Sequence, residues 1–193
     1  MNYFRRNGRR ALFVILTSVF SASCAQEDMS EARNQRATAT VEDIMQFIID
    51  PAADAIWDAV ITDVTVDGIV EIFPTTDSDW EMLRQKAVTL AEATNLLLIK
   101  DRRIAGPQSR SELPGVDLHP NAIQLLLEDN QIGWDTAVRE LLEASLEVIN
   151  SVNARSINEL LVAGTALDTA CETCHTQFWY PGYGDPRPDE SVP

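Results

Sequence analysis

Basic residues are scarce in this 193-residue chain. It has 15 Lys and Arg against 30 Asp and Glu, so its formal net charge is −15 at pH 7. Nucleic-acid binding rests on Lys and Arg side chains that neutralise phosphates. The charge therefore argues against a nucleic-acid partner. It favours solubility and would attract basic patches on partner proteins.

Long apolar runs are also missing beyond the first 20 residues, so no later stretch predicts a membrane span. The N-terminus differs, because four arginines precede the short apolar run Ala11–Phe20 and small residues follow it. This pattern is typical of an export signal. We expect a periplasmic protein with a signal peptide at 1–25, a flexible lead-in at 26–40, one domain at 41–180 and a disordered or surface-lying tail at 181–193.

The first cysteine leaves two alternatives open. Ser23-Cys24-Ala25 fits a small-x-small cleavage site, in which case Cys24 leaves with the signal or lies beside the cut. Cys24 after Ala22-Ser23 also resembles a lipoprotein signal, whose cysteine would be acylated. A membrane association is expected only in that second case.

The other two cysteines form the most informative motif, Cys171-Glu172-Thr173-Cys174-His175. C-x-x-C-H is the pattern of covalent c-type haem attachment. Two thiols add to the vinyl groups of haem, and the imidazole ligates the iron. On a helix these three residues share one face. The pattern predicts haem c as the single covalent cofactor, with Cys171, Cys174 and His175 binding it.

The motif has three other interpretations. A structural zinc site needs four ligands, and the chain offers only Cys24 and His119 besides the motif. A thioredoxin-like redox motif should follow a strand in a βαβ unit, whereas this one ends an apolar helical stretch. A Cys171–Cys174 disulfide would close a strained short loop and would leave His175 without a role.

Apolar residues recur mainly at helical spacing from Val41 onward, which predicts an all-α four-helix bundle whose last helix carries the motif. The first three long helices are expected at 40–63, 78–100 and 134–152, and the first of them should be interrupted near Pro51. A Ser78/Glu81 capping box should begin the second helix, and a Ser156/Glu159 box should begin the last one. A short helix is expected at 122–128. The prolines, glycines and charges of residues 101–120 predict a long surface connection. Residues 64–73 are expected to form an interhelical loop, and a hairpin with its turn at Asp67-Gly68 is the alternative.

A C-x-x-C-H near the end of the last helix of such a bundle resembles the class II cytochromes c, the cytochrome c′ and cytochrome c-556 group. The resemblance covers about Val41 to Phe178. It implies that Cys171 and Cys174 form the thioethers, that His175 is the proximal ligand, and that Phe178 matches a common family aromatic. Trp179 departs from the family, which often has Arg there. Five aromatic residues are candidates for packing on the macrocycle and are equally well explained as core or dimer-contact residues: Trp57, Trp134, Phe178, Trp179 and Tyr180.

The resemblance also implies a choice at the sixth iron position, which is empty in cytochromes c′ and closed by a Met from the first helix in the c-556 type. Met45 stands where that ligand is expected, and a Met on an apolar face is otherwise core filler. We expect Met45 to be the distal ligand. His119, in the long connection, is expected to pack in the loop rather than bind iron.

The leading hypothesis is an exported monohaem cytochrome that carries single electrons between periplasmic redox partners, after loading by the cytochrome c maturation machinery. The alternative is a five-coordinate, cytochrome c′-like protein that binds nitric oxide or other small gases. Peroxidase-type catalysis needs distal acid–base groups, and we find no convincing set, so we do not expect an enzyme. A homodimer through Ala52, Ala53 and Ala55 is compatible with the pattern.

Overall fold

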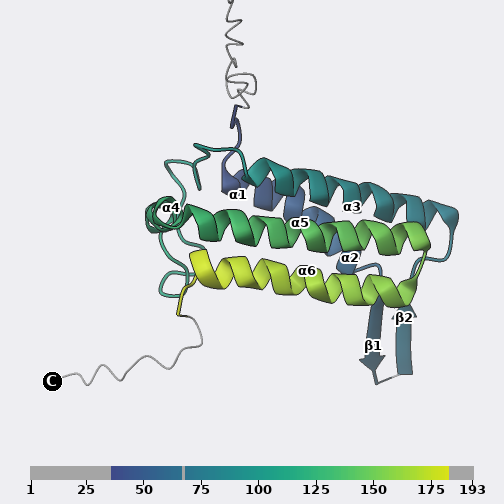
Figure 1. Cartoon of the computed structure of the whole chain (residues 1–193). Helices are drawn as coiled ribbons and strands as arrows, with labels where there is room; N and C mark the ends of the chain where they lie inside the picture. The colour runs from purple at the N-terminus through teal and green to yellow at the C-terminus, as the bar shows by residue number, and fades with distance from the viewer. Residues whose placement is uncertain (1–35, 67, 183–193) are drawn as a thin grey trace, which may run out of the picture. The chain divides into compact units, whose positions relative to one another are not determined.

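The computed structural model describes residues 36–66 and 68–182 of the chain. The expected signal peptide with Cys24, most of the lead-in, Asp67 and the tail beyond residue 182 lie outside these residues. The described part is mostly helical and has one small two-stranded sheet (Figure 1).

The first helical segment consists of three pieces that follow one another directly, and we call it the N-terminal helix. It comprises α1 (Val41–Ile44), the π-helix η2 (Met45–Ile49) and α2 (Asp50–Trp57). The strands β1 (Ile61–Thr65) and β2 (Gly68–Ile72) come next. The remaining helices are α3 (Asp77–Leu97), α4 (Pro120–Asp129), α5 (Gln131–Ala154) and α6 (Ile157–Phe178).

The helix α5 is at the centre of the packing, because it contacts both α3 and α6 along its length. The N-terminal helix packs against α3, and the short α4 packs across the ends of α5 and α6 (Figure 1). One continuous apolar core is buried between these elements. The stripes expected from the sequence supply it, with residues such as Ile56, Leu83, Leu90, Val138 and Leu167 almost completely buried.

The interruption predicted at Pro51 is present, and it takes the form of a π-helix. Proline lacks an N–H group, and its ring clashes with the carbonyl four residues earlier in an α-helix. Pro51 occupies the start of α2, and the N–H of Asp50 donates to the carbonyl of Met45, five residues back. The wider turn absorbs the proline without ending the helix. Met45 is the first residue of this turn.

The prediction of a helix to residue 63 followed by an interhelical loop was wrong, and the hairpin alternative holds. The helix ends at Trp57, and β1 and β2 pair antiparallel with Val64 opposite Ile69 and Thr65 opposite Gly68. Ile61, Val64, Ile69, Val70 and Ile72 give this stretch a high β-propensity. Gly68 has a positive φ of 134°, which an L side chain rarely adopts.

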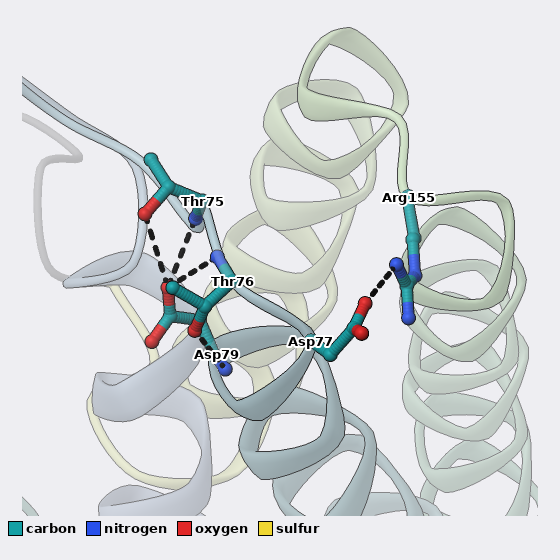
Figure 2. Close-up of polar contacts among 5 residues, drawn as sticks. All are labelled: Thr75, Thr76, Asp77, Asp79 and Arg155. Atoms are coloured by element: carbon teal, nitrogen blue, oxygen red, sulfur yellow. Dashed lines mark hydrogen bonds and ion pairs between the residues drawn. The ribbon is translucent and has the colours of Figure 1, made fainter.

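The start of α3 also differs from the prediction. Thr76 caps the helix, not Ser78: its hydroxyl accepts from the Asp79 N–H, and the Asp79 carboxylate accepts from the Thr76 N–H at 2.8 Å (Figure 2). These hydrogen bonds lower the pKa of Asp79. Ser156 does cap α6, accepting from the Glu159 N–H, but only this half of the expected box is present, since the Ser156 N–H donates to the carbonyl of Ser151 at 3.1 Å. Arg155, before that cap, forms an ion pair with Asp77 (Figure 2).

Replacement of the observed cap should therefore be costly, and replacement of the expected one should not. Thr76→Ala is expected to lower the free energy of unfolding by about 1 kcal/mol, the usual loss for an N-cap. Ser78→Ala, at an exposed position two residues on, is the matched control and should change it by less than about 0.5 kcal/mol. Urea unfolding followed by circular dichroism measures both, and equal losses would contradict the assignment of the cap.

Candidate functional site

The site lies at the C-terminal end of α6, and two other helices hold that end in place. Phe178 is fully buried and meets Trp134 of α5 edge to face, with 5.4 Å between ring centroids. Trp134 in turn donates from Nε1 to the carbonyl of Leu97 at the end of α3, at 3.2 Å. The last turn of α6 is therefore fixed against both α5 and α3. Phe178 and Trp134, expected to pack on a macrocycle or in the core, are core residues.

The chain just after α6 is tied to the long connection. The Leu118 N–H donates to the carbonyl of Trp179 at 2.8 Å, and the Trp179 N–H donates to the carbonyl of His175 at 2.7 Å. The Tyr180 hydroxyl donates to the Glu172 carboxylate at 2.9 Å. Desolvation, and then the contact with Glu172, raise the pKa of Tyr180 to about 12. The connection is thus tied by a backbone hydrogen bond to the segment just after the motif.

The three motif residues differ in their surroundings. Cys174 is buried in the core, Cys171 is half-buried at its margin, and both are free thiols. His175 is half-buried and lines a cavity of about 260 Å³. One turn of α6 therefore presents two thiols to the apolar interior and its margin, and an imidazole to the cavity.

The cavity brings together the two expected iron ligands. Met45 of η2 and His175 of α6 both line it, as do Asp50, Trp179 and Tyr180. The structure places His175 and Met45 at one site, although they come from opposite ends of the described chain. Asp50 is an exposed residue, yet desolvation raises the pKa of its carboxyl, and the nearby His175 opposes that shift.

The connection between α3 and α4 forms the other wall of this cavity. Its Ser109 hydroxyl donates to Glu42, and Gln46 donates from Nε2 to Glu112 at 3.1 Å. The N–H groups of Val41 and Glu42 donate to connection carbonyls at 2.9 Å each. Residues 101–120 were predicted only as a surface connection, so their part in the cavity wall was not predicted. The length of this segment could have indicated a functional role, since loops this long without regular structure are usually functional.

The thiols of the motif are poor nucleophiles in this setting. Desolvation raises the pKa of Cys171 to about 12, with Asp168, Asp50 and Glu172 raising it further. Desolvation also raises the pKa of Cys174 to about 12, and Cys171 adds to the shift. Reactive C-x-x-C thiols have lowered pKa values, typically at helix N-termini or beside cations. This motif lies at the opposite end of a helix, among carboxylates.

The other aromatic and histidine candidates lie in several places. Trp57 donates from Nε1 to the Gly164 carbonyl at 3.1 Å and so joins α2 to α6. Trp179 and Tyr180 line the cavity. His119 is exposed and accepts the Asn121 N–H at 3.3 Å as the N-cap of α4, so it does not line the cavity.

The donor set fits haem c, and the space around it is small. The chain supplies two thiols three residues apart, an adjoining imidazole that lines the cavity and, from the N-terminal helix, a methionine that lines the same cavity, whereas the two cysteines do not line it. Ligand pockets commonly span about 300–1,000 Å³, so 260 Å³ is tight for a macrocycle. The extra room would come from the connection, the wall with the least regular structure. Within residues 36–66 and 68–182, no three His, Cys, Asp or Glu side chains are grouped as in a metal site.

Comparisons with known proteins add no assignment. No protein-family model, no curated protein and no solved structure matches this chain. No helix within the described ranges is long and apolar enough to cross a bilayer. What the site does has to be argued from its residues.

The thiol environment predicts slow alkylation. In haem-free protein carrying Cys24→Ser, Cys171 and Cys174 should react with iodoacetamide at pH 8 on the order of 30-fold more slowly than in urea. The thiolate fraction falls with the raised pKa, and greater intrinsic nucleophilicity recovers about half of that loss on a logarithmic scale. Mass spectrometry of time points measures the rate. Faster reaction in the folded protein would contradict the thiol assignment and favour a redox motif.

Proposed function

We propose that this protein is an exported monohaem c-type cytochrome of the class II kind, a four-helix bundle that carries single electrons between periplasmic redox partners. Haem is attached through Cys171 and Cys174, His175 is the proximal ligand, and Met45 is the distal ligand. The observation that carries the proposal is that Met45 and His175 line one cavity from facing helices.

The donor chemistry supports this assignment over the other interpretations of the motif. When bound, haem supplies a one-electron iron couple whose potential depends on the axial ligands, burial and hydrogen bonding. A thioether and an imidazole are the axial pair of many electron-transfer cytochromes. The raised pKa values of the half-buried Cys171 and the buried Cys174 argue against a reactive redox motif.

The geometry of the N-terminal helix supports Met45 as a ligand rather than core filler. Met45 is only half-buried and begins the π-helix, and π-bulges are frequent at functional sites. The neighbours Ile44 and Ile49 are buried and supply the packing of this stretch. Met45 packs only at the margin of the core, so a ligand at this position would cost less packing than one at Ile44 or Ile49.

The residues around the cavity also suit docking to a basic partner. Glu42, Asp50, Glu112 and Asp117 line it, and Glu172 lies one turn away on α6. Carboxylates around a redox centre raise the encounter rate with positively charged proteins. This agrees with the net charge of −15. Periplasmic location rests on the N-terminal sequence pattern, which also decides whether Cys24 anchors the protein.

A second candidate is gas binding at a five-coordinate iron. The observation that favours it is the apolar part of the same cavity wall, where Ile104, Leu118 and Ile123 would suit a small uncharged ligand. If the Met45 side chain turned away from the iron, this wall would enclose an open position.

Replacement of Met45 separates the two candidates. Absorption spectra of periplasmically matured protein should show sharp, separated visible bands in the reduced state and no change on adding carbon monoxide. In Met45→Ala the bands should broaden, and carbon monoxide should then bind, because the sixth position opens. Met82→Ala on α3, an exposed methionine, is the matched control and should keep the parent spectrum.

Two outcomes would contradict the proposal. Parent protein that binds carbon monoxide with a spectrum unchanged in Met45→Ala would show an open iron and support gas binding. Protein that shows no haem spectrum, although the cells mature c-type cytochromes, would contradict haem attachment. The metal and disulfide interpretations of the motif would then remain.

A further inference from the structure

The hairpin formed by β1 and β2 is the least packed part of the described chain. It projects from the helices at the end where α2 finishes and α3 begins (Figure 1). Every described residue from 62 to 73 is exposed. The exposed apolar side chains there are those of Val64, Val66, Ile69, Val70, Ile72 and Phe73.

Such an element needs a partner. A two-stranded hairpin is marginally stable in water on its own. Among the described residues β2 pairs with β1 alone, so the outer edge of β2 is open to a further strand. Natural edges are usually blunted by lysine, proline or a bulge. Neither β1 nor β2 contains lysine or proline, and their pairing register is continuous from Ile61–Ile72 to Thr65–Gly68.

We propose that β2 pairs with β2 of a second copy of this chain, in antiparallel fashion about a two-fold axis, to form a four-stranded sheet between two protomers. Homo-oligomers most often use such two-fold contacts, in which the same surface meets itself. The sheet would run in the order β1, β2, β2 of the partner, β1 of the partner.

The charge pattern selects β2 over β1 as the shared edge. With the axis at the middle of the strand, Val70 faces Val70 of the second copy, and Ile69 faces its Glu71. The same arrangement on β1 would place Asp63 directly opposite another Asp63, and like charges opposite each other destabilise a strand pair. In the β2 arrangement the two Asp63 residues lie on outer strands, about 14 Å apart at the usual strand spacing. That exceeds the Debye length of about 8 Å at physiological salt.

The apolar side chains of one face would then become continuous. Asp63 is paired with Val70 and Ile61 with Ile72, so these four share a face of the hairpin. Across the axis, Val70 meets its own copy, and Ile61 and Ile72 extend the strip on each side. Of the earlier candidates for a dimer contact, Ala52 and Ala53 are buried within the chain's own core and are not available, and Ala55 is half-buried.

The first test is the oligomeric state of the full-length, periplasmically matured protein by sedimentation velocity at micromolar concentration. The parent should be a dimer, and Val70→Asp should be a monomer because it places two carboxylates opposite each other. Val64→Asp is the matched control: it makes the same change on β1, where Val64 is more exposed (76% against 49%), and it should leave the dimer intact.

Charge complementation keeps the test decisive even if a variant is destabilised. Val70→Asp and Val70→Lys should each be monomeric alone, and an equimolar mixture should restore a dimer, since opposite charges then meet at the axis. A monomeric parent, a dimer that survives Val70→Asp, or a mixture that stays monomeric would each overturn the proposal. So would a monomer that sediments with phosphatidylcholine vesicles through this hairpin. None of these outcomes depends on whether haem is bound.

Discussion

The contact between Trp134 and Phe178 is the interaction on which the rest of the site depends. Phe178 is the fourth residue after Cys174 and the third after His175. Burial of its ring therefore fixes the position of the motif, which lies one turn earlier on the same helix. Trp134 locks that ring to α5, and its hydrogen bond to the Leu97 carbonyl adds α3. The sides of α6 that bear the thiols and the imidazole follow from this anchor and from helical geometry.

The facing wall follows from a second constraint, the proline at position 51. Because Pro51 cannot donate a hydrogen bond, the N-terminal helix widens into a π-helix that begins at Met45. The helix stays continuous, so Ile49 and Ile56 are still buried against α3, while Met45 lies beside the cavity. The connection then closes the space through Glu42, Gln46 and the carbonyl of Trp179. A rigid helix end and a locally widened helix together make one small cavity.

Particular residues show which parts of the structure could be predicted from the sequence. The long helices were predictable because their apolar stripes are long and regular, and the Pro51 interruption was predictable because proline chemistry is local. The cap of α3 was not, since Thr76/Asp79 and Ser78/Glu81 offer the same chemistry two residues apart. The hairpin was predicted only as the alternative to a loop; almost all of its residues are exposed in the structure, so no buried stripe marks it, and the backbone pairing reveals it. The cavity wall formed by the connection depends on long-range contacts such as Gln46–Glu112, which no local pattern encodes.

The most direct measurement for the central claim is the intact mass of the chain purified from the periplasm of cells that mature c-type cytochromes, under denaturing conditions. The account predicts one haem retained covalently by the parent protein. The Cys171→Ser/Cys174→Ser double variant should lose it, and Cys24→Ser should keep it. A parent chain with no covalent haem, or one lighter by two hydrogens because Cys171 and Cys174 form a disulfide, would contradict the account.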